Sequence, residues 1–176
     1  HLEIAEKAKR IRNHGQKEKY SHEEVGLNSR LDSIQAAILL AKLKFFGEEL
    51  EKRNLVAKRY RENLKDLKKI IPPFIKKENK SSFAQFSIQV ENRDALKEFL
   101  ERSGVPTMIH YPIPLHLQKA FSEFKYKQGD FPVAEKISSK ILSLPMDAYK
   151  NETEIKYICD KIKEFMKNGK TKDNYY

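Results

Sequence analysis

Residues 26–43 read GLNSRLDSIQAAILLAKL and join a polar loop to a long helix. Ser29 and Asp32 are both residue types that begin helices, and apolar side chains then recur at helical spacing. These side chains are Leu31, Ile34, Ala37, Ile38, Ala41 and Leu43. The spacing predicts one broad apolar face. Upstream, residues 4–12 predict a helix that ends at Gly15, and residues 16–29 predict an extended loop or a hairpin.

Downstream of this segment, helical and strand patterns alternate. Phe45-Phe46-Gly47 predicts a bend, and residues 48–67 predict a second long helix. The pattern then predicts strands at 83–90, 105–110 and 141–144, helices at 95–102, 131–139 and 152–167, and a short helical turn at 116–121. We therefore expect an α/β fold with long helices and a small sheet flanked by helices.

The composition limits the class of protein. A chain of 176 residues with 39% hydrophobic and 34% charged residues suits a globular core under a charged surface. No apolar stretch reaches the roughly 20 residues that cross a bilayer, so we expect no membrane partner. The first residues, HLEIAEK, have neither an initiator Met nor the apolar run of a signal peptide, and we interpret them as a cut inside a larger protein.

The lone Cys159 has no partner for an internal disulfide, which favours the cytoplasm, and its helical context predicts a core residue. The net charge of +10 comes from lysines spread along the predicted helices. This spread favours a solvated surface over a nucleic-acid interface. His14, His22, His110 and His116 are spaced too irregularly for a metal site, and we expect none.

Two clusters are candidate ligand sites. Asn28 and Arg30 stand two residues apart in extended backbone, so their side chains point the same way and suit a phosphate or carboxylate. Alternatively, Ser29 or Asp32 caps the helix and Arg30 is merely exposed. The second cluster is residues 110–116, where two prolines stiffen the chain after a strand. Its alternative is a rigid connector with a packed Tyr111.

Several motifs occur in one order along the chain. They are RNHGQ at 12–16, GLNSRLDSIQAA at 26–37, GVPT at 104–107, IHYPIPLH at 109–116, FPVAE at 131–135 and LSLPM at 142–146. Over residues 3–167 the chain resembles the sugar aminotransferase family named after DegT, DnrJ, EryC and StrS. The resemblance implies the fold-type I architecture, in which a large domain binds pyridoxal phosphate (PLP), a smaller C-terminal α/β domain follows, and the proteins are dimers.

The resemblance also implies a domain organisation and an activity. Residues 1–47 correspond to an inter-domain segment and the start of the long helical region, residues 48–168 to the C-terminal domain, and residues 169–176 to a frayed tail; the large PLP domain is absent. Such proteins move an amino group, from glutamate in our expectation, onto a nucleotide-linked keto-sugar for surface glycan synthesis. The form of residues 109–112 favours a 3-keto deoxyhexose or uronate.

By the same resemblance, Asn28 contacts the PLP phosphate of a neighbouring subunit, Arg30 helps to hold the cofactor or anionic substrate groups, and His110 and Tyr111 face the sugar nucleotide. The family's Schiff-base lysine lies upstream of the segment matching residues 2–16, so we assign no catalytic residue. We expect this chain alone to bind no PLP and to be inactive. The alternative is a stand-alone binding or structural module. The apolar face at residues 31–43 predicts a homo-oligomer.

Overall fold

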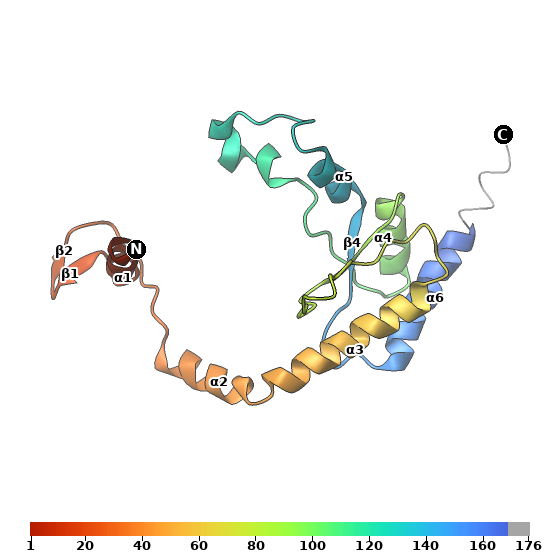
Figure 1. Ribbon diagram of the computed structural model, residues 1–176, viewed down its shortest axis with the longest axis horizontal. Helices are drawn as coiled ribbons and strands as arrows, with labels where there is room; N and C mark the ends of the chain where they lie inside the picture. Colours follow the sequence, from red (N-terminus) through yellow and green to blue (C-terminus); the bar gives the residue numbers. More distant parts are fainter. Residues whose placement is uncertain (169–176) are drawn as a thin grey trace. The chain divides into compact units, whose positions relative to one another are not determined.

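The computed structural model describes residues 1–168, which form one compact unit of residues 1–47 and a second from Glu48 onward (Figure 1). The first unit contains α1 (Leu2–Arg12), β1 (Gln16–Glu18), β2 (Ser21–His22) and α2 (Ser33–Leu43). β1 and β2 pair antiparallel, with Gln16 opposite His22, which confirms a hairpin between the two helices. The roles of the two units as inter-domain segment and C-terminal domain stay predictions.

The first residue of α2 is set by Asp32. Its carboxylate accepts a hydrogen bond of 2.8 Å from the Ile34 amide, and the Gln35 side chain accepts one of 3.2 Å from the Asp32 amide. This reciprocal capping box satisfies two backbone donors that a helix N-terminus otherwise leaves unpaired. Of the two helix starts open in the sequence, Asp32 is therefore the observed one.

Two glycines allow the chain to pack against itself in the first unit. A Cβ atom on Gly26 would lie 2.0 Å from the Gly15 nitrogen, and one on Gly15 would lie 1.7 Å from the Glu24 carbonyl oxygen. Gly15 also has a φ of +69°, which side-chain-bearing residues rarely adopt. Only glycine fits this close backbone contact, which brings residues 24–26 against the end of α1.

The second unit is a small sheet with helices around it. Its elements are α3 (Phe46–Leu64), β3 (Phe86–Gln89), α4 (Arg93–Arg102), the 3₁₀ turns η1 (Leu115–Leu117) and η2 (Lys119–Phe124), α5 (Pro132–Lys140), β4 (Ile141–Leu144) and α6 (Glu152–Asn168). β3 pairs antiparallel with β4, with Phe86 opposite Leu144 and Gln89 opposite Ile141. α4 contacts both α6 and β4 (Figure 1). This arrangement confirms an α/β unit with a small sheet.

The core of the second unit is apolar. Its buried members are Val56, Ala57, Tyr60, Leu64, Ile70, Phe83, Phe86, Ile88, Val90, Leu96, Leu100, Val105, Leu142, Leu144, Ile155, Ile158, Cys159 and Ile162. The rings of Tyr60 and Phe86 stack with centroids 4.9 Å apart, which links α3 to the sheet. Cys159 is fully buried, as predicted, and burial raises the pKa of its thiol to about 12.

The strand predicted at 105–110 is wrong. Met108 alone bridges to Ser143, through hydrogen bonds of 3.2 Å from the Met108 amide and 2.7 Å from the Ser143 amide. Pro106 has no N–H and cannot donate to a ladder, so pairing does not extend toward the start of the segment. The predicted strand at 83–90 is shortened to β3, and the predicted tail at 169–176 lies outside the described residues. Within residues 1–168, the helices are too short or too polar for any of them to traverse a bilayer.

Candidate functional site

The loop that carries Asn28 and Arg30 is held against the end of α1 by backbone hydrogen bonds. The His14 amide donates to the Leu27 carbonyl oxygen at 2.9 Å, and the Ser29 amide donates to the Arg12 carbonyl oxygen at 2.9 Å. Asn13 and Asn28 form an isolated antiparallel bridge at the same place. Residues 27–29 are therefore extended, as the sequence pattern required for Asn28 and Arg30 to share a side.

The side chains of this loop form a small exposed cluster. Arg30 donates through Nε to the Asn28 side-chain oxygen at 3.3 Å and through Nη1 to the Asn13 side-chain oxygen at 3.4 Å. No carboxylate of residues 1–168 pairs with this guanidinium, so its positive charge is not neutralised by the described part of the chain. Asp32 caps α2, as one alternative expected, while the binding of an anion by Asn28 and Arg30 stays a prediction.

The second cluster surrounds His110. Its Nδ1 lies 2.9 Å from the Ser143 hydroxyl, which lies 2.8 Å from the Ser87 hydroxyl. The Tyr111 ring meets the His110 ring edge-on at 5.5 Å, and Tyr111 is 69% exposed. A packed Tyr111, one of the alternatives open in the sequence, is therefore wrong. The peptide bond between His110 and Tyr111 is cis.

Glu135 closes the loop that follows His110 and Tyr111. Its carboxylate lies 3.0 Å from His116 Nε2 and accepts hydrogen bonds from the Gly129 amide at 2.9 Å and the Phe131 amide at 3.3 Å. The His116 ring packs 4.8 Å from the Phe131 ring. Partial desolvation would raise the pKa of the Glu135 carboxyl, but these hydrogen bonds outweigh it and hold the pKa below its ordinary value. The IHYPIPLH and FPVAE motifs thus meet in space.

A cavity of about 240 Å³ lies beside His110. Its lining consists of Ala84, Gln85, Pro106, Thr107, Met108, His110, Ser143, Leu144, Pro145 and Met146. Thr107 is only 8% exposed, and its hydroxyl has no hydrogen-bond partner among the described residues. A buried hydroxyl without a partner is energetically unfavourable, and the polar side chain in this lining with a ring nitrogen to offer is His110.

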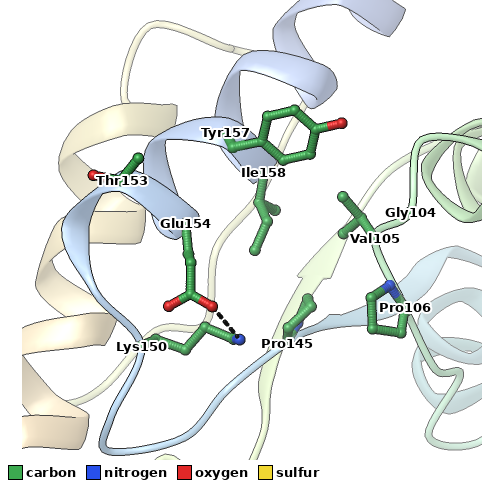
Figure 2. A pocket seen from close by; sticks show the side chains of 9 residues that line it. All are labelled: Gly104, Val105, Pro106, Pro145, Lys150, Thr153, Glu154, Tyr157 and Ile158. Atoms are coloured by element: carbon green, nitrogen blue, oxygen red, sulfur yellow. Dashed lines mark hydrogen bonds and ion pairs between the residues drawn. The ribbon is translucent and has the colours of Figure 1, made fainter.

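A larger cavity of about 340 Å³ shares Pro106 and Pro145 with the first. Figure 2 shows Val105 and Pro106 on one side of it and the ion pair of Lys150 and Glu154, at 3.2 Å, on the other. Charged groups here are already paired and the rest of the lining is mainly apolar. We therefore place the candidate ligand groups in the smaller cavity, which His110 lines.

Sequence reasoning missed four polar residues of these clusters: Asn13, Ser87, Thr107 and Ser143. Asn13 looked like a helix stop, and the other three looked like ordinary strand residues. Each acquires its partner or its cavity through a contact with a distant part of the chain, which no local pattern signals. Among residues 1–168, no group of three or more His, Cys, Asp or Glu side chains is arranged to hold a metal ion.

Comparison with known proteins gives consistent matches. The chain is 44% identical over 157 residues to UDP-2-acetamido-2-deoxy-3-oxo-D-glucuronate aminotransferase of Pseudomonas aeruginosa, covering 89% of this chain and 43% of that protein. It is 34% identical over 163 residues to dTDP-3-amino-3,6-dideoxy-alpha-D-galactopyranose transaminase of Aneurinibacillus thermoaerophilus, covering 93% of this chain and 44% of that protein. The chain thus spans less than half the length of these relatives.

A solved structure agrees with this match. The crystal structure of a DegT DnrJ EryC1 StrS aminotransferase from Brucella abortus superposes with a TM-score of 0.80 at 41% identity, covering 94% of this chain and 44% of that one. The model of the DegT/DnrJ/EryC1/StrS aminotransferase family matches residues 2–163. With this match over most of its length, the chain belongs to the DegT/DnrJ/EryC1/StrS aminotransferase family.

Proposed function

We propose that this chain works as the C-terminal part of a PLP-dependent aminotransferase that transfers an amino group from glutamate to a nucleotide-linked keto-sugar. Both relatives described above are named for sugar nucleotides with an oxo or amino group at position 3 of the sugar, which supports a 3-keto substrate. The setting we propose is the cytoplasm, and the product serves surface glycan synthesis.

The open Arg30 guanidinium is the structural feature that best supports this proposal. Two amide oxygens, of Asn28 and Asn13, orient the guanidinium without neutralising it. A phosphate suits this donor set because guanidinium and amide N–H groups can each bind one of its oxygens. Arg30 and Asn28 would therefore hold the phosphate of PLP, supplied by one subunit to its neighbour.

When bound, PLP supplies the electron sink that amino-group transfer requires. In our proposal the lysine that anchors it is not a residue of this chain, because no lysine here stands in the family's motif for that residue. The chain alone is therefore inactive. Its own contribution is to bind and orient: Arg30 and Asn28 hold a phosphate, the half-buried His110 offers a ring nitrogen, and the exposed Tyr111 ring offers a surface on which a sugar or base packs.

A hybrid enzyme tests this function. The segment of the Pseudomonas aeruginosa relative that matches this chain is replaced by residues 3–167, and transamination is measured with glutamate and that enzyme's 3-oxo sugar nucleotide. We expect the hybrid to be active. Arg30→Ala should weaken PLP binding about tenfold or more, since a charge-assisted contact is lost, and Arg30→Lys should restore part of it. A folded hybrid that binds PLP but transfers no amino group would count against the proposal.

We further propose that α2 lies in a contact between copies of the protein. Its large apolar side chains are exposed by half or more, among them Ile34 at 73% and Leu40 at 66%. Light scattering of the chain should show self-association that Ile38→Asp weakens. Val25→Asp is the matched control, because Val25 is 98% exposed but lies outside α2. A strictly monomeric wild-type chain would overturn this part of the proposal.

A further inference from the structure

We propose that Ser87 and Ser143 form a hydrogen-bonded relay that holds His110 in one neutral tautomer, with Nδ1 as acceptor and Nε2–H as donor. At the cavity of about 240 Å³ that His110 lines, this donor binds an oxygen of the substrate's sugar. The relay is a property of the chain itself, whereas the identity of the ligand rests on the proposed function. Ser87 and Ser143 are thus positioning residues that act through His110.

The sheet register places the relay. Ser87 and Ser143 are directly opposite each other on β3 and β4, so their hydroxyls meet at 2.8 Å. The bridge between Met108 and Ser143 brings the following residues of that segment to the same strand, and His110 Nδ1 lies 2.9 Å from the Ser143 hydroxyl. Ser143 is only 5% exposed, so its hydroxyl depends on these two partners.

Counting hydroxyl hydrogens favours one direction for the relay, because the other direction leaves the hydrogen of the half-buried Ser87 hydroxyl to solvent. Ser143 has one hydroxyl hydrogen and stands between two partners, so it donates to one and accepts from the other. If Ser87 donates to Ser143 and Ser143 donates to His110 Nδ1, both hydroxyl hydrogens are used inside the protein. In the reverse direction the Ser87 hydrogen has no acceptor among residues 1–168. The first direction leaves the imidazole proton on Nε2, which has no protein partner in the described chain.

Thr107 is a second polar residue in the lining of this cavity. Its side chain is 8% exposed, lines the same cavity, and its hydroxyl is unpaired in the described part of the chain. The Thr107 hydroxyl oxygen is closed off from solvent, so the imidazole N–H is the group that meets an oxygen acceptor in this cavity. Ligand pockets commonly measure about 300–1,000 Å³, so this smaller cavity suits one sugar ring better than a whole sugar nucleotide.

The tautomer is read by long-range ¹H–¹⁵N NMR of the chain with ¹⁵N-labelled histidine at about pH 8, where an unperturbed imidazole is neutral. His110→Gln identifies the signal. We expect an unprotonated Nδ1 and a protonated Nε2. His22 is the internal standard, because its Nδ1 lies 2.9 Å from the His14 carbonyl oxygen, which can only accept. His22 must therefore show the opposite tautomer.

Substitutions then test whether the relay determines the tautomer of His110. Ser143→Ala should shift the His110 ring signals toward the average of both tautomers, and Ser143→Thr, which keeps a hydroxyl, should restore them. Ser139→Ala is the control, since the Ser139 hydroxyl donates to the Lys136 carbonyl oxygen at 2.8 Å on exposed α5. A wild-type His110 protonated on Nδ1, or an unchanged tautomer in Ser143→Ala, overturns the relay.

Titration with UDP-N-acetylglucosamine as the probe tests the occupant separately. We expect shifts at His110 and Thr107, with affinity about fivefold weaker in Ser143→Ala, as for the loss of one oriented hydrogen bond. If the probe leaves the NMR signals of His110 and Thr107 unchanged, the assigned occupant is wrong. If His110 nevertheless shows the expected tautomer, the relay itself is still supported. Because the tautomer is read without ligand or cofactor, failure of the relay and failure of the proposed function are separate results.

Discussion

The two units of the chain differ in whether the apolar side chains of their helices are buried. α2 carries the most apolar run of the sequence, yet it buries no residue, and Ile34 is 73% exposed. α4 is shorter and more polar, yet Leu96 and Leu100 are fully buried. An apolar helix face needs a second layer to cover it, and only the second unit supplies one, from the sheet and α6.

Each unit is therefore stabilised internally by a different kind of interaction. The second unit has a continuous apolar core, and burial of such surface dominates the stability of a domain. The first unit relies on backbone hydrogen bonds and on the close approach of Gly15 and Gly26. Its candidate ligand groups, Asn28 and Arg30, are exposed, whereas the Ser143 partner of His110 is buried.

A matched pair of isoleucines gives the largest expected difference between the units. Ile88→Ala, at a fully buried site on β3, should lower the free energy of unfolding by about 2–5 kcal/mol. Ile34→Ala, at a site 73% exposed on α2, should change it by less than about 0.5 kcal/mol. Urea denaturation followed by circular dichroism at low protein concentration measures both. Equal losses would mean that the α2 face is covered even at that concentration.

A pair of glycines tests the close packing of the first unit. Gly26→Ala should speed hydrogen exchange of the Leu27 and Ser29 amides about tenfold or more, because its Cβ would lie 2.0 Å from the Gly15 nitrogen. Gly47→Ala is the control, since a Cβ there meets nothing within 4 Å. Exchange in β4 should stay unchanged. Faster hydrogen exchange of the β4 amides in Gly26→Ala would show that the two units unfold together.

A pair of tyrosines compares buried and exposed polar contacts. The Tyr60 hydroxyl donates to the Pro145 carbonyl oxygen at 2.7 Å, and Tyr60 is fully buried, so Tyr60→Phe should cost about 1 kcal/mol. Tyr111→Phe, at a side chain 69% exposed, should leave the thermal midpoint unchanged. If both substitutions are neutral, the hydrogen bond from Tyr60 to Pro145 adds no measurable stability, and Tyr60 contributes through its packing in the core, including the stacking on Phe86 of β3.

The smallest expected effect is the loss of the Glu135 hydrogen bonds at low pH. Hydrogen bonds hold the pKa of the Glu135 carboxyl below its ordinary value of 4.5, so its stabilisation of the loop is complete above that value. The stabilisation is lost as pH falls through the lowered pKa. Amide shifts of Gly129 and Phe131 should follow this transition, and Glu135→Gln should abolish it, whereas Glu123→Gln in the same loop should not. A transition that survives Glu135→Gln would assign the loop's acid sensitivity to another group.

The sequence predicted those parts of the fold that local periodicity determines. The helix after Asp32, the hairpin alternative for residues 16–29, and the helices that became α5 and α6 followed from spacing and capping residues. The strand predicted at 105–110 failed because side-chain alternation says nothing about whether a partner strand can pair, and Pro106 removes one of the donors required. The motifs also indicated the family, which the match over residues 2–163 confirms.

The sequence by itself determined most of the helices of this protein and the proximity of Asn28 to Arg30, because residues two apart in extended backbone share a side. Tertiary structure alone decided that Asn13 joins that pair and that Glu135 closes the loop onto His116. It also decided that the Ser143 hydroxyl lies 2.9 Å from His110 Nδ1 and that His110 lines a cavity. These contacts join residues far apart in the chain, and only the folded backbone brings their hydrogen-bonding groups within reach.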